Sequence, residues 1–315
     1  MIPICLITGF LGSGKTTLLK HLIQKYRDRR IVFLVNEFSS TDVDGVLLSK
    51  ETDYLEPIVG GSIFCRCLVS QFIQVLERLP SRFGSPQAPV EGVIIEASGM
   101  ANPRVAALML QEARLDQQYR LASVVSVVDP GSFLKLIHTL PNIPAQVEAA
   151  DLVLINKIDL YPKEQIERTE AALLEIQPRL KPKRVNRCQI ELDLFRIRSH
   201  QEAAGEYARC RDPHFLEISV QLKSDLDLDG FRAALEKIRD EIYRVKGFVR
   251  AGGAWYYIDF SASGFHAEKS TLSRSAELVF ILNGTNHPKA RRLAVSLQRG
   301  KKTCLFQDGP IKSCP

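Results

Sequence analysis

Residues 9–17 read Gly-Phe-Leu-Gly-Ser-Gly-Lys-Thr-Thr, and they directly follow the apolar run Ile-Cys-Leu-Ile at 4–7. This stretch decides the fold, because it matches G-x-x-x-x-G-K-[ST], the phosphate-binding loop (P-loop) of nucleoside triphosphatases. A short buried strand enters such a loop and a helix leaves it. Apolar residues at 18–23 have the helical spacing that this arrangement needs. The sequence therefore predicts a nucleotide-binding P-loop domain.

Each residue type in the loop has a physical task. Glycines let backbone N–H groups point at phosphate oxygens, and the following helix N-terminus adds positive potential. Lys15 is expected to reach the β- and γ-phosphates, and the Thr16 hydroxyl to ligate Mg²⁺. The nucleotide-binding residues predicted in this loop are Gly9, Gly12, Ser13, Gly14, Lys15, Thr16 and Thr17.

A second motif predicts which base is bound. The apolar run at 152–155 predicts a buried strand, and it ends in Asn-Lys-Ile-Asp at 156–159, the N-K-x-D pattern of guanine-specific GTPases. The Asp159 carboxylate can accept from guanine N1–H and from its exocyclic amine, which adenine does not offer in that arrangement. Leaving that carboxylate unpaired makes the wrong base costly. Lys157 is expected to lie along the base and Asn156 to hold the loops together. GTP is therefore predicted rather than ATP.

Strand and helix patterns alternate between these motifs. Strands are predicted at 31–35, 93–95 and 124–128, and helices at 72–79, 104–110 and 163–176. Such alternation predicts an α/β fold with a doubly wound, mostly parallel sheet and ligand loops at the carboxyl ends of the strands. Glu96, which follows one strand, is expected to hold Mg²⁺ through water. Gly99 is free to re-aim its N–H at a γ-phosphate. The predicted catalytic residues are Lys15, Thr16, Glu96 and Gly99.

The chain of 315 residues exceeds what one core usually holds, so a second domain is expected. Polar residues replace the periodic patterns at 205–213, which separates a P-loop domain at 1–205 from a smaller domain at 213–315. The second domain is predicted as α+β with an antiparallel sheet. Its expected strands lie at 215–220, 255–260 and 278–282, and its helices at 229–243 and 289–298.

Composition is that of a globular enzyme, with 45% hydrophobic and 25% charged residues. No apolar run reaches the length of a membrane span, so no membrane partner is expected. The N-terminus lacks a basic region and a cleavage site, so secretion is not expected. Seven scattered cysteines predict reduced thiols and a cytoplasmic location. The net charge is +6, and the basic clusters at 181–187 and 289–302 are interpreted as solvated faces rather than as nucleic-acid sites.

Several motifs together resemble those of the CobW-type GTPases, relatives of the nickel-insertion GTPases UreG and HypB. They are Asn-Glu-Phe at 36–38, Glu-Ala-Ser-Gly-Met-Ala-Asn-Pro at 96–103, Val-Val-Asp at 127–129, and Ala-Asp at 150–151 leading to 156–159. The resemblance covers about residues 1–200. Lys-Gly-Phe at 246–248 and Trp255 resemble signals of the smaller CobW-type C-terminal domain. The resemblance implies a GTP-driven metallochaperone or metal-insertion protein, usually for zinc or cobalt.

The metal motif of that family is C-x-C-C, and this sequence departs from it. Residues 60–68 read Gly-Gly-Ser-Ile-Phe-Cys-Arg-Cys-Leu, so one or two of the expected thiols are missing. Cys65 and Cys67 point the same way from an extended segment and can share one soft metal. Two thiolates do not complete a tetrahedral site, so Glu37 or another group is expected to join them. The alternative is that both cysteines are small apolar residues beside a nucleotide-dependent loop.

Two classes of function remain open. In the first, the protein is a metallochaperone in which Mg²⁺–GTP orders the segment from Glu37 to Cys67 and changes its affinity for Zn²⁺ or Co²⁺. In the second, it is a GTP-dependent conformational chaperone for a cofactor-dependent enzyme, with no transferable metal. Both imply GTP and GDP as ligands and an unidentified client protein. Hydrolysis is expected to be slow, because no arginine finger or water-positioning glutamine can be assigned.

Overall fold

The computed structural model describes residues 1–37, 48–66, 68–197, 206–207, 215–271, 275–284 and 287–299. The chain divides into two compact units, Met1–Asp212 and Pro213–Pro315. Each unit has its own sheet and its own core. None of the helices in the described part of the chain is both long enough and apolar enough to span a membrane.

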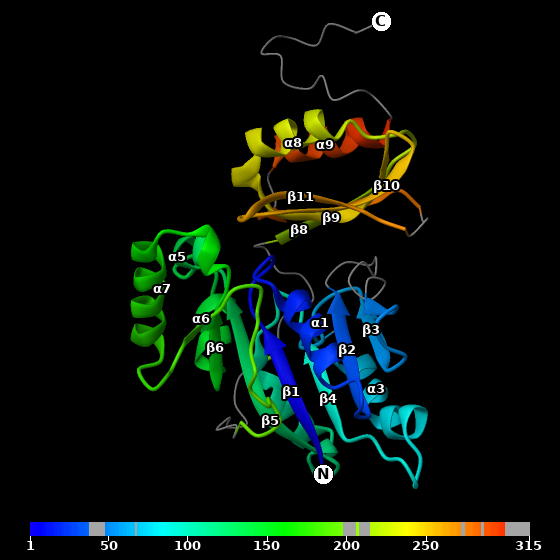
Figure 1. The fold of residues 1–315 in the computed structure, drawn as a ribbon, viewed down its shortest axis with the longest axis vertical. Coiled ribbons are helices and arrows are strands. Elements are labelled where there is room, and N and C mark those ends of the chain that lie inside the picture. Colours follow the sequence, from blue (N-terminus) through cyan, green and yellow to red (C-terminus); the bar gives the residue numbers. More distant parts are fainter. Residues whose placement is uncertain are drawn as a thin grey trace, which may run out of the picture. The chain divides into compact units, whose positions relative to one another are not determined.

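The first unit is built on a seven-stranded sheet in the order β3-β2-β4-β1-β5-β6-β7, and every pair of neighbours is parallel (Figure 1). Its strands are β1 Ile2–Thr8, β2 Ile31–Glu37, β3 Leu55–Val59, β4 Gly92–Glu96, β5 Tyr119–Val128, β6 Leu152–Ile155 and β7 Lys183–Arg184. Its α-helices are α1 Lys15–Lys25, α3 Val69–Phe83, α4 Ala106–Glu112, α5 Pro130–Leu136, α6 Asn142–Glu148 and α7 Lys163–Ile176. The predicted parallel α/β fold is confirmed.

Both faces of this sheet are buried, because helices cover each of them. Along β1, Leu6 belongs to the core that includes Phe72 of α3, whereas Ile7 belongs to the opposite core with Leu18 of α1. Alternate residues of a strand point to opposite faces, so a strand buried on both sides reads as an unbroken apolar run. This is the physical reason that the apolar run at 4–7 predicted a strand correctly.

The second unit is a five-stranded antiparallel sheet in the order β11-β10-β9-β12-β8. Its strands are β8 Phe215–Gln221, β9 Ile242–Ala251, β10 Ala254–Ser261, β11 Gly264–Lys269 and β12 Glu277–Asn283. Helices α8 Leu228–Lys237 and α9 Pro288–Gln298 lie on one face of it (Figure 1). Phe231 of α8 and Leu293 of α9 meet Val245 and Phe280 of the sheet in one core.

The helix predicted at 229–243 is wrong over its last six residues. The α-helix ends at Lys237, a 3-10 turn follows at Arg239–Glu241, and Ile242 begins β9. The apolar spacing of Ile238 and Ile242 continues the helical pattern, but β9 pairs with β10 on one side and with β12 on the other. Pairing between distant segments outweighs local periodicity here. Strands β3, β7 and β11 and helices α5 and α6 were not predicted either.

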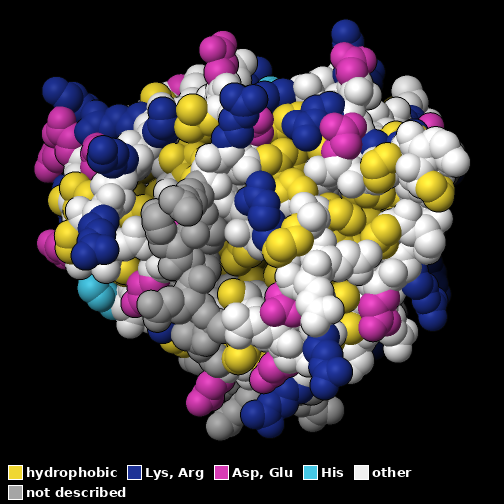
Figure 2. Space-filling view, turned by 90° about the horizontal axis from the view of Figure 1, so that it is seen from below, with side chains coloured by type: hydrophobic (Ala, Val, Ile, Leu, Met, Phe, Trp, Pro, Cys, Tyr) yellow, Lys and Arg dark blue, Asp and Glu magenta, His cyan; other side chains and the backbone are white. Residues whose placement is uncertain are grey.

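Charged side chains on the face of the molecule shown in Figure 2 are dispersed. Lys and Arg side chains lie among Asp and Glu side chains there, with hydrophobic side chains between them. Among the described side chains on that face, both charge signs are mixed, whereas a nucleic-acid-binding surface gathers Lys and Arg in one patch.

Candidate nucleotide-binding site

The predicted nucleotide-binding segments converge at one edge of the parallel sheet. The P-loop leaves the carboxyl end of β1, Glu96 ends β4, Asp129 follows β5 and Asn156 follows β6. In a parallel sheet these ends lie on the same side, which is where ligands bind in doubly wound folds.

Close approach to β5 explains why residue 9 is a glycine. Its φ is +134°, and a Cβ built on Gly9 would lie 2.2 Å from the main-chain oxygen of Val127. A side chain there would collide with the backbone of β5, and L residues rarely adopt this φ. The first turn of the P-loop is therefore pressed against the sheet.

Lys15 is buried, at 5% exposure, in the first turn of α1. Its Nζ donates to the main-chain oxygen of Phe10 at 3.3 Å, so the ammonium group lies over the P-loop. A cation held in this position attracts the phosphate oxygens that the loop amides also bind.

Thr16 and Glu96, which are 80 residues apart in sequence, lie side by side. The Thr16 Oγ1 donates to Oε1 of Glu96 at 3.2 Å, and Glu96 is buried at the end of β4. Hydroxyl and carboxylate oxygens are the hard ligands that Mg²⁺ prefers, so this pair fits the predicted ion.

Asn156 joins two loops that are distant in sequence. It is 2% exposed, its Nδ2 donates to the main-chain oxygen of Ser13 at 2.9 Å, and its Oδ1 accepts from the N–H of Cys188 at 2.8 Å. The predicted contact between Asn156 and neighbouring loops is present, and one of those loops is the P-loop.

Lys157 bridges the P-loop and a buried carboxylate. Its Nζ donates to the main-chain oxygen of Gly12 at 2.6 Å and to Oδ2 of Asp129 at 2.9 Å. Asp129 is 3% exposed, and its Oδ1 also caps α5 by accepting from the N–H of Gly131 at 2.8 Å. These two hydrogen bonds hold the ammonium group of Lys157 between the P-loop and Asp129, and they thereby orient the stem.

Asp159 lies in a short 3-10 turn at Ile158–Leu160 and is exposed. Its carboxylate is solvated in this position. The penalty for a wrong base therefore arises only when a bound base covers the carboxylate and removes its water.

Cys188 is a site neighbour that sequence reasoning missed, because it was counted among scattered cysteines. It is 0% exposed, and its Sγ donates to the main-chain oxygen of Gly14 at 3.4 Å, across 174 residues. Burial raises the pKa of this thiol to about 12. Arg187 and Cys188 both have positive φ, at 48° and 55°, which is uncommon for residues other than glycine. No local pattern signals a contact of such long range.

Gly99 packs directly on the P-loop. A Cβ built on it would lie 2.6 Å from the N atom of Leu11. Its main-chain oxygen accepts from Nδ2 of Asn142 at 3.4 Å and from Nε2 of Gln146 at 3.1 Å. Gln146 also donates to the oxygen of Ala101 at 3.1 Å. The segment after β4 is therefore held by α6 on one side and meets the P-loop on the other.

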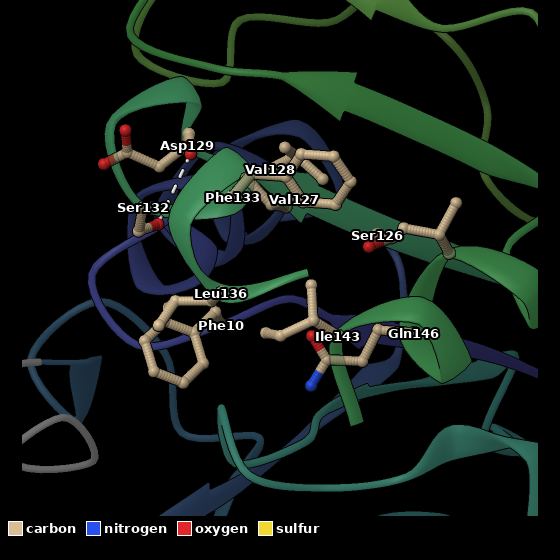
Figure 3. Close-up of a pocket in the computed structure, with 11 residues that line it drawn as sticks. Phe10, Ser126, Val127, Val128, Asp129, Ser132, Phe133, Leu136, Ile143 and Gln146 are labelled. Atoms are coloured by element: carbon tan, nitrogen blue, oxygen red, sulfur yellow. Dashed lines mark hydrogen bonds between the residues drawn. The ribbon is translucent and has the colours of Figure 1, made fainter. Parts of the chain in front are cut away.

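A small cavity lies between the end of β5, α5 and α6, and Figure 3 shows Phe10, Ser126 and Gln146 around it. Its volume of about 10 Å³ is that of a single water molecule and far below that of a nucleobase. In Figure 3 the Asp129 carboxylate points away from it. The cavity is therefore not where the nucleotide is expected.

The predicted metal loop follows the carboxyl end of β3, at the same sheet edge. Cys65 is buried in the turn before α3. It is disulfide-bonded in the structure, whereas the sequence predicted reduced thiols. Cys67 lies outside the described residues, and Glu37 is the last residue of β2. Among the described residues, no group of three or more His, Cys, Asp and Glu side chains is arranged to hold a metal.

This fold, with its P-loop between β1 and α1, defines a P-loop nucleoside triphosphatase. Residues 3–182 match the family model of the CobW/HypB/UreG nucleotide-binding domain, and residues 215–298 match that of the cobalamin synthesis protein CobW C-terminal domain. The chain belongs to the CobW/HypB/UreG family of GTPases.

Two relatives of this chain are named zinc chaperones, and one solved structure aligns with it. The chain is 29% identical to zinc chaperone YjiA of Escherichia coli over 270 residues, covering 80% of this chain and 83% of that protein. It is 30% identical to zinc chaperone CobW of Pseudomonas aeruginosa over 202 residues, 55% of this chain and about half, 53%, of that relative. A crystal structure of Zn(II)-bound YjiA GTPase from E. coli aligns with a TM-score of 0.46 at 20% identity, covering 95% of this chain and 97% of that one.

Proposed function

We propose that this protein is a slowly hydrolysing GTPase that acts as a zinc or cobalt metallochaperone for a client protein. The observation that carries the proposal is the meeting, at one sheet edge, of the P-loop, the Thr16–Glu96 pair and the loop that bears Cys65. Relatives that are named zinc chaperones support the choice of metal. The cytoplasm, where thiols are kept reduced, is the proposed location.

In this proposal the nucleotide is held by groups of this chain alone. Lys15 binds the β- and γ-phosphates together with the amides of the P-loop, and Asp159 binds the guanine edge beside Lys157. Thr16 ligates Mg²⁺ directly and Glu96 holds it through water. When bound, Mg²⁺ supplies positive charge that neutralises the phosphate oxygens. Gly99, which already contacts the P-loop, senses the γ-phosphate through its N–H.

The transition metal is cargo, bound by Cys65 and Cys67 with Glu37. A cysteine ligates Zn²⁺ or Co²⁺ as its thiolate, so the disulfide at Cys65 has to be reduced before this residue can bind the metal. The segment from Glu37 to Cys67 starts at the end of β2 and reaches the turn before α3. A γ-phosphate that orders this segment changes the metal affinity, and linkage makes the metal change nucleotide affinity by the same factor.

The second candidate, a GTP-dependent conformational chaperone without transferable metal, is favoured by one observation. The family's C-x-C-C motif is incomplete at residues 60–68. In that case Cys65 serves only in packing before α3.

Metal titration separates the two candidates. Reduced protein is titrated with Zn²⁺ or Co²⁺ in the apo, GDP-bound and non-hydrolysable-GTP-bound forms. One equivalent is expected to bind, with an affinity that depends on the nucleotide and falls as pH falls, because protons compete for the thiolates. Cys65→Ser and Cys67→Ser should abolish uptake, and Cys5→Ala, a buried thiol in β1, should not. Identical metal affinity in all three forms would favour the conformational chaperone.

Hydrolysis is tested on the same protein. Turnover should require Mg²⁺, and Lys15→Ala should abolish it by removing the charge at the phosphates. A basal rate of about 10 s⁻¹, which is the scale of assisted GTPases, would contradict the claim that the site lacks an activating group. A Thr16→Ala variant should show weaker dependence on Mg²⁺.

A further inference from the structure

One buried amide ties the loop after β4 to the loop that carries Cys65. Asn36 lies near the end of β2 and is 5% exposed. Its Nδ2 donates to the main-chain oxygens of Ile58 at 3.2 Å and Gly61 at 2.7 Å. Its Oδ1 accepts from the N–H groups of Ile63 at 3.0 Å and Ser98 at 3.2 Å. All of these hydrogen bonds are to main-chain groups.

The partners of Asn36 belong to the two segments that the proposed function needs to connect. Ser98 comes two residues after Glu96 and directly before Gly99, which packs on the P-loop. Gly61 and Ile63 lie in the loop that leads to Cys65. We propose that Asn36 is the positioning residue that transmits the nucleotide state of the segment at Glu96–Gly99 to the metal loop. This inference rests on the proposed function.

Burial is what makes the connection effective. Buried N–H and C=O groups keep hydrogen-bond partners because losing them is costly. When a γ-phosphate draws Gly99 toward itself, the N–H of Ser98 moves with it. Asn36 then either follows, pulling on Gly61 and Ile63, or loses its bond to Ser98. In both cases the restraint on the metal loop changes.

The loop passes such a movement on to Cys65. Ile63 and Phe64 are 0% and 1% exposed, and the ring of Phe64 packs edge-on against Phe72 of α3, with centroids 6.2 Å apart. The next residue, Cys65, donates its N–H to the oxygen of Ser62 at 2.9 Å. Ile63 and Phe64 are therefore held in the core, so a shift at the amide bonded to Asn36 re-aims the turn with Cys65.

Three variants and one control isolate this role. Asn36→Ala removes all four hydrogen bonds, whereas Asn36→Asp keeps an oxygen that accepts from both N–H groups but sets its second oxygen against the carbonyl oxygens of Ile58 and Gly61. Asn36→Ser, whose hydroxyl is too short to reach both loops, replaces the alanine variant if that protein does not fold. Gln177→Ala is the matched control, because Nε2 of Gln177 also donates to three main-chain oxygens, those of Val147, Glu148 and Ala150, and touches neither loop.

The first readout is the ratio of zinc affinities of reduced protein in the GDP and non-hydrolysable-GTP forms. We expect at least about a fivefold ratio in the wild type, the lower end of known couplings. Asn36→Ala should bring it within about twofold of unity, and Asn36→Asp should lower it because an acceptor oxygen faces two carbonyl oxygens, whereas Gln177→Ala should keep it. A merely structural role would lower stability in Asn36→Ala and leave the ratio unchanged.

The second readout needs no metal. Hydrogen exchange of the peptide that covers residues 60–68 is compared in the same two nucleotide forms. Wild type should show a nucleotide-dependent difference that Asn36→Ala or Asn36→Ser loses. If wild type shows this difference but takes up no zinc, the metallochaperone proposal fails and the role of Asn36 stands. If the alanine or serine variant keeps both the exchange difference and the affinity ratio, the inference is overturned.

Discussion

Replacing Asn156 by alanine should loosen the P-loop and weaken the binding of GTP and GDP to the same extent. The side chain is 2% exposed and makes two hydrogen bonds, to the oxygen of Ser13 and to the N–H of Cys188. Leaving a buried partner without its hydrogen bond costs about 1–3 kcal/mol. Two such losses amount to about 2–6 kcal/mol, and the lower end applies where water reaches the loop.

At about 2 kcal/mol, the loss corresponds to about a 30-fold fall in affinity if the loops must be re-formed on binding. Isothermal titration with GDP and with a non-hydrolysable GTP analogue measures it, and urea unfolding measures the accompanying loss of stability. Asn283→Ala is the matched control, because its Nδ2 makes one exposed bond, to the oxygen of Asp240, in the second unit. If Asn156→Ala changes the affinity of either nucleotide by less than about twofold, the loop-joining role assigned to Asn156 is wrong.

Three further predictions concern single residues. Asp159→Asn should lose guanine preference and gain affinity for xanthosine triphosphate, because the amide presents a donor to a donor of guanine; an unchanged ratio of GTP to ATP affinity in competition would count against it. Gly9→Ala should abolish nucleotide binding and lower the melting temperature, because its Cβ would lie 2.2 Å from Val127 O; wild-type binding would refute the close approach. The Cys188 thiol is buried and its pKa is raised to about 12, so it should resist an alkylating reagent at pH 8 until urea unfolds the protein. Labelling is mapped by mass spectrometry, and rapid labelling of the native protein would show that the contact with Gly14 opens readily.

The sequence alone determined the features whose chemistry is contained in a few consecutive residues. Residues 9–17 and 156–159 each hold a complete binding pattern, and the apolar runs beside them predicted β1 and β6 because a strand buried on both faces needs apolar residues on both. The parallel fold then placed both motifs at one sheet edge. The same local reasoning failed at Ile242, where pairing of β9 with two distant strands decided between helix and strand.

Tertiary structure alone decided which side chains hold the loops in place. The contact of Lys157 with Asp129 spans 28 residues, that of Asn36 with Ser98 spans 62, and that of Cys188 with Gly14 spans 174. No periodicity or motif spacing encodes such pairs, because each depends on where the sheet brings two strand ends together. A lone cysteine after β7 therefore reads as an ordinary residue in the sequence, and the motif at 36–38 does not reveal the hydrogen-bond partners of Asn36. Their roles arise from burial, which obliges polar groups to find partners across the fold.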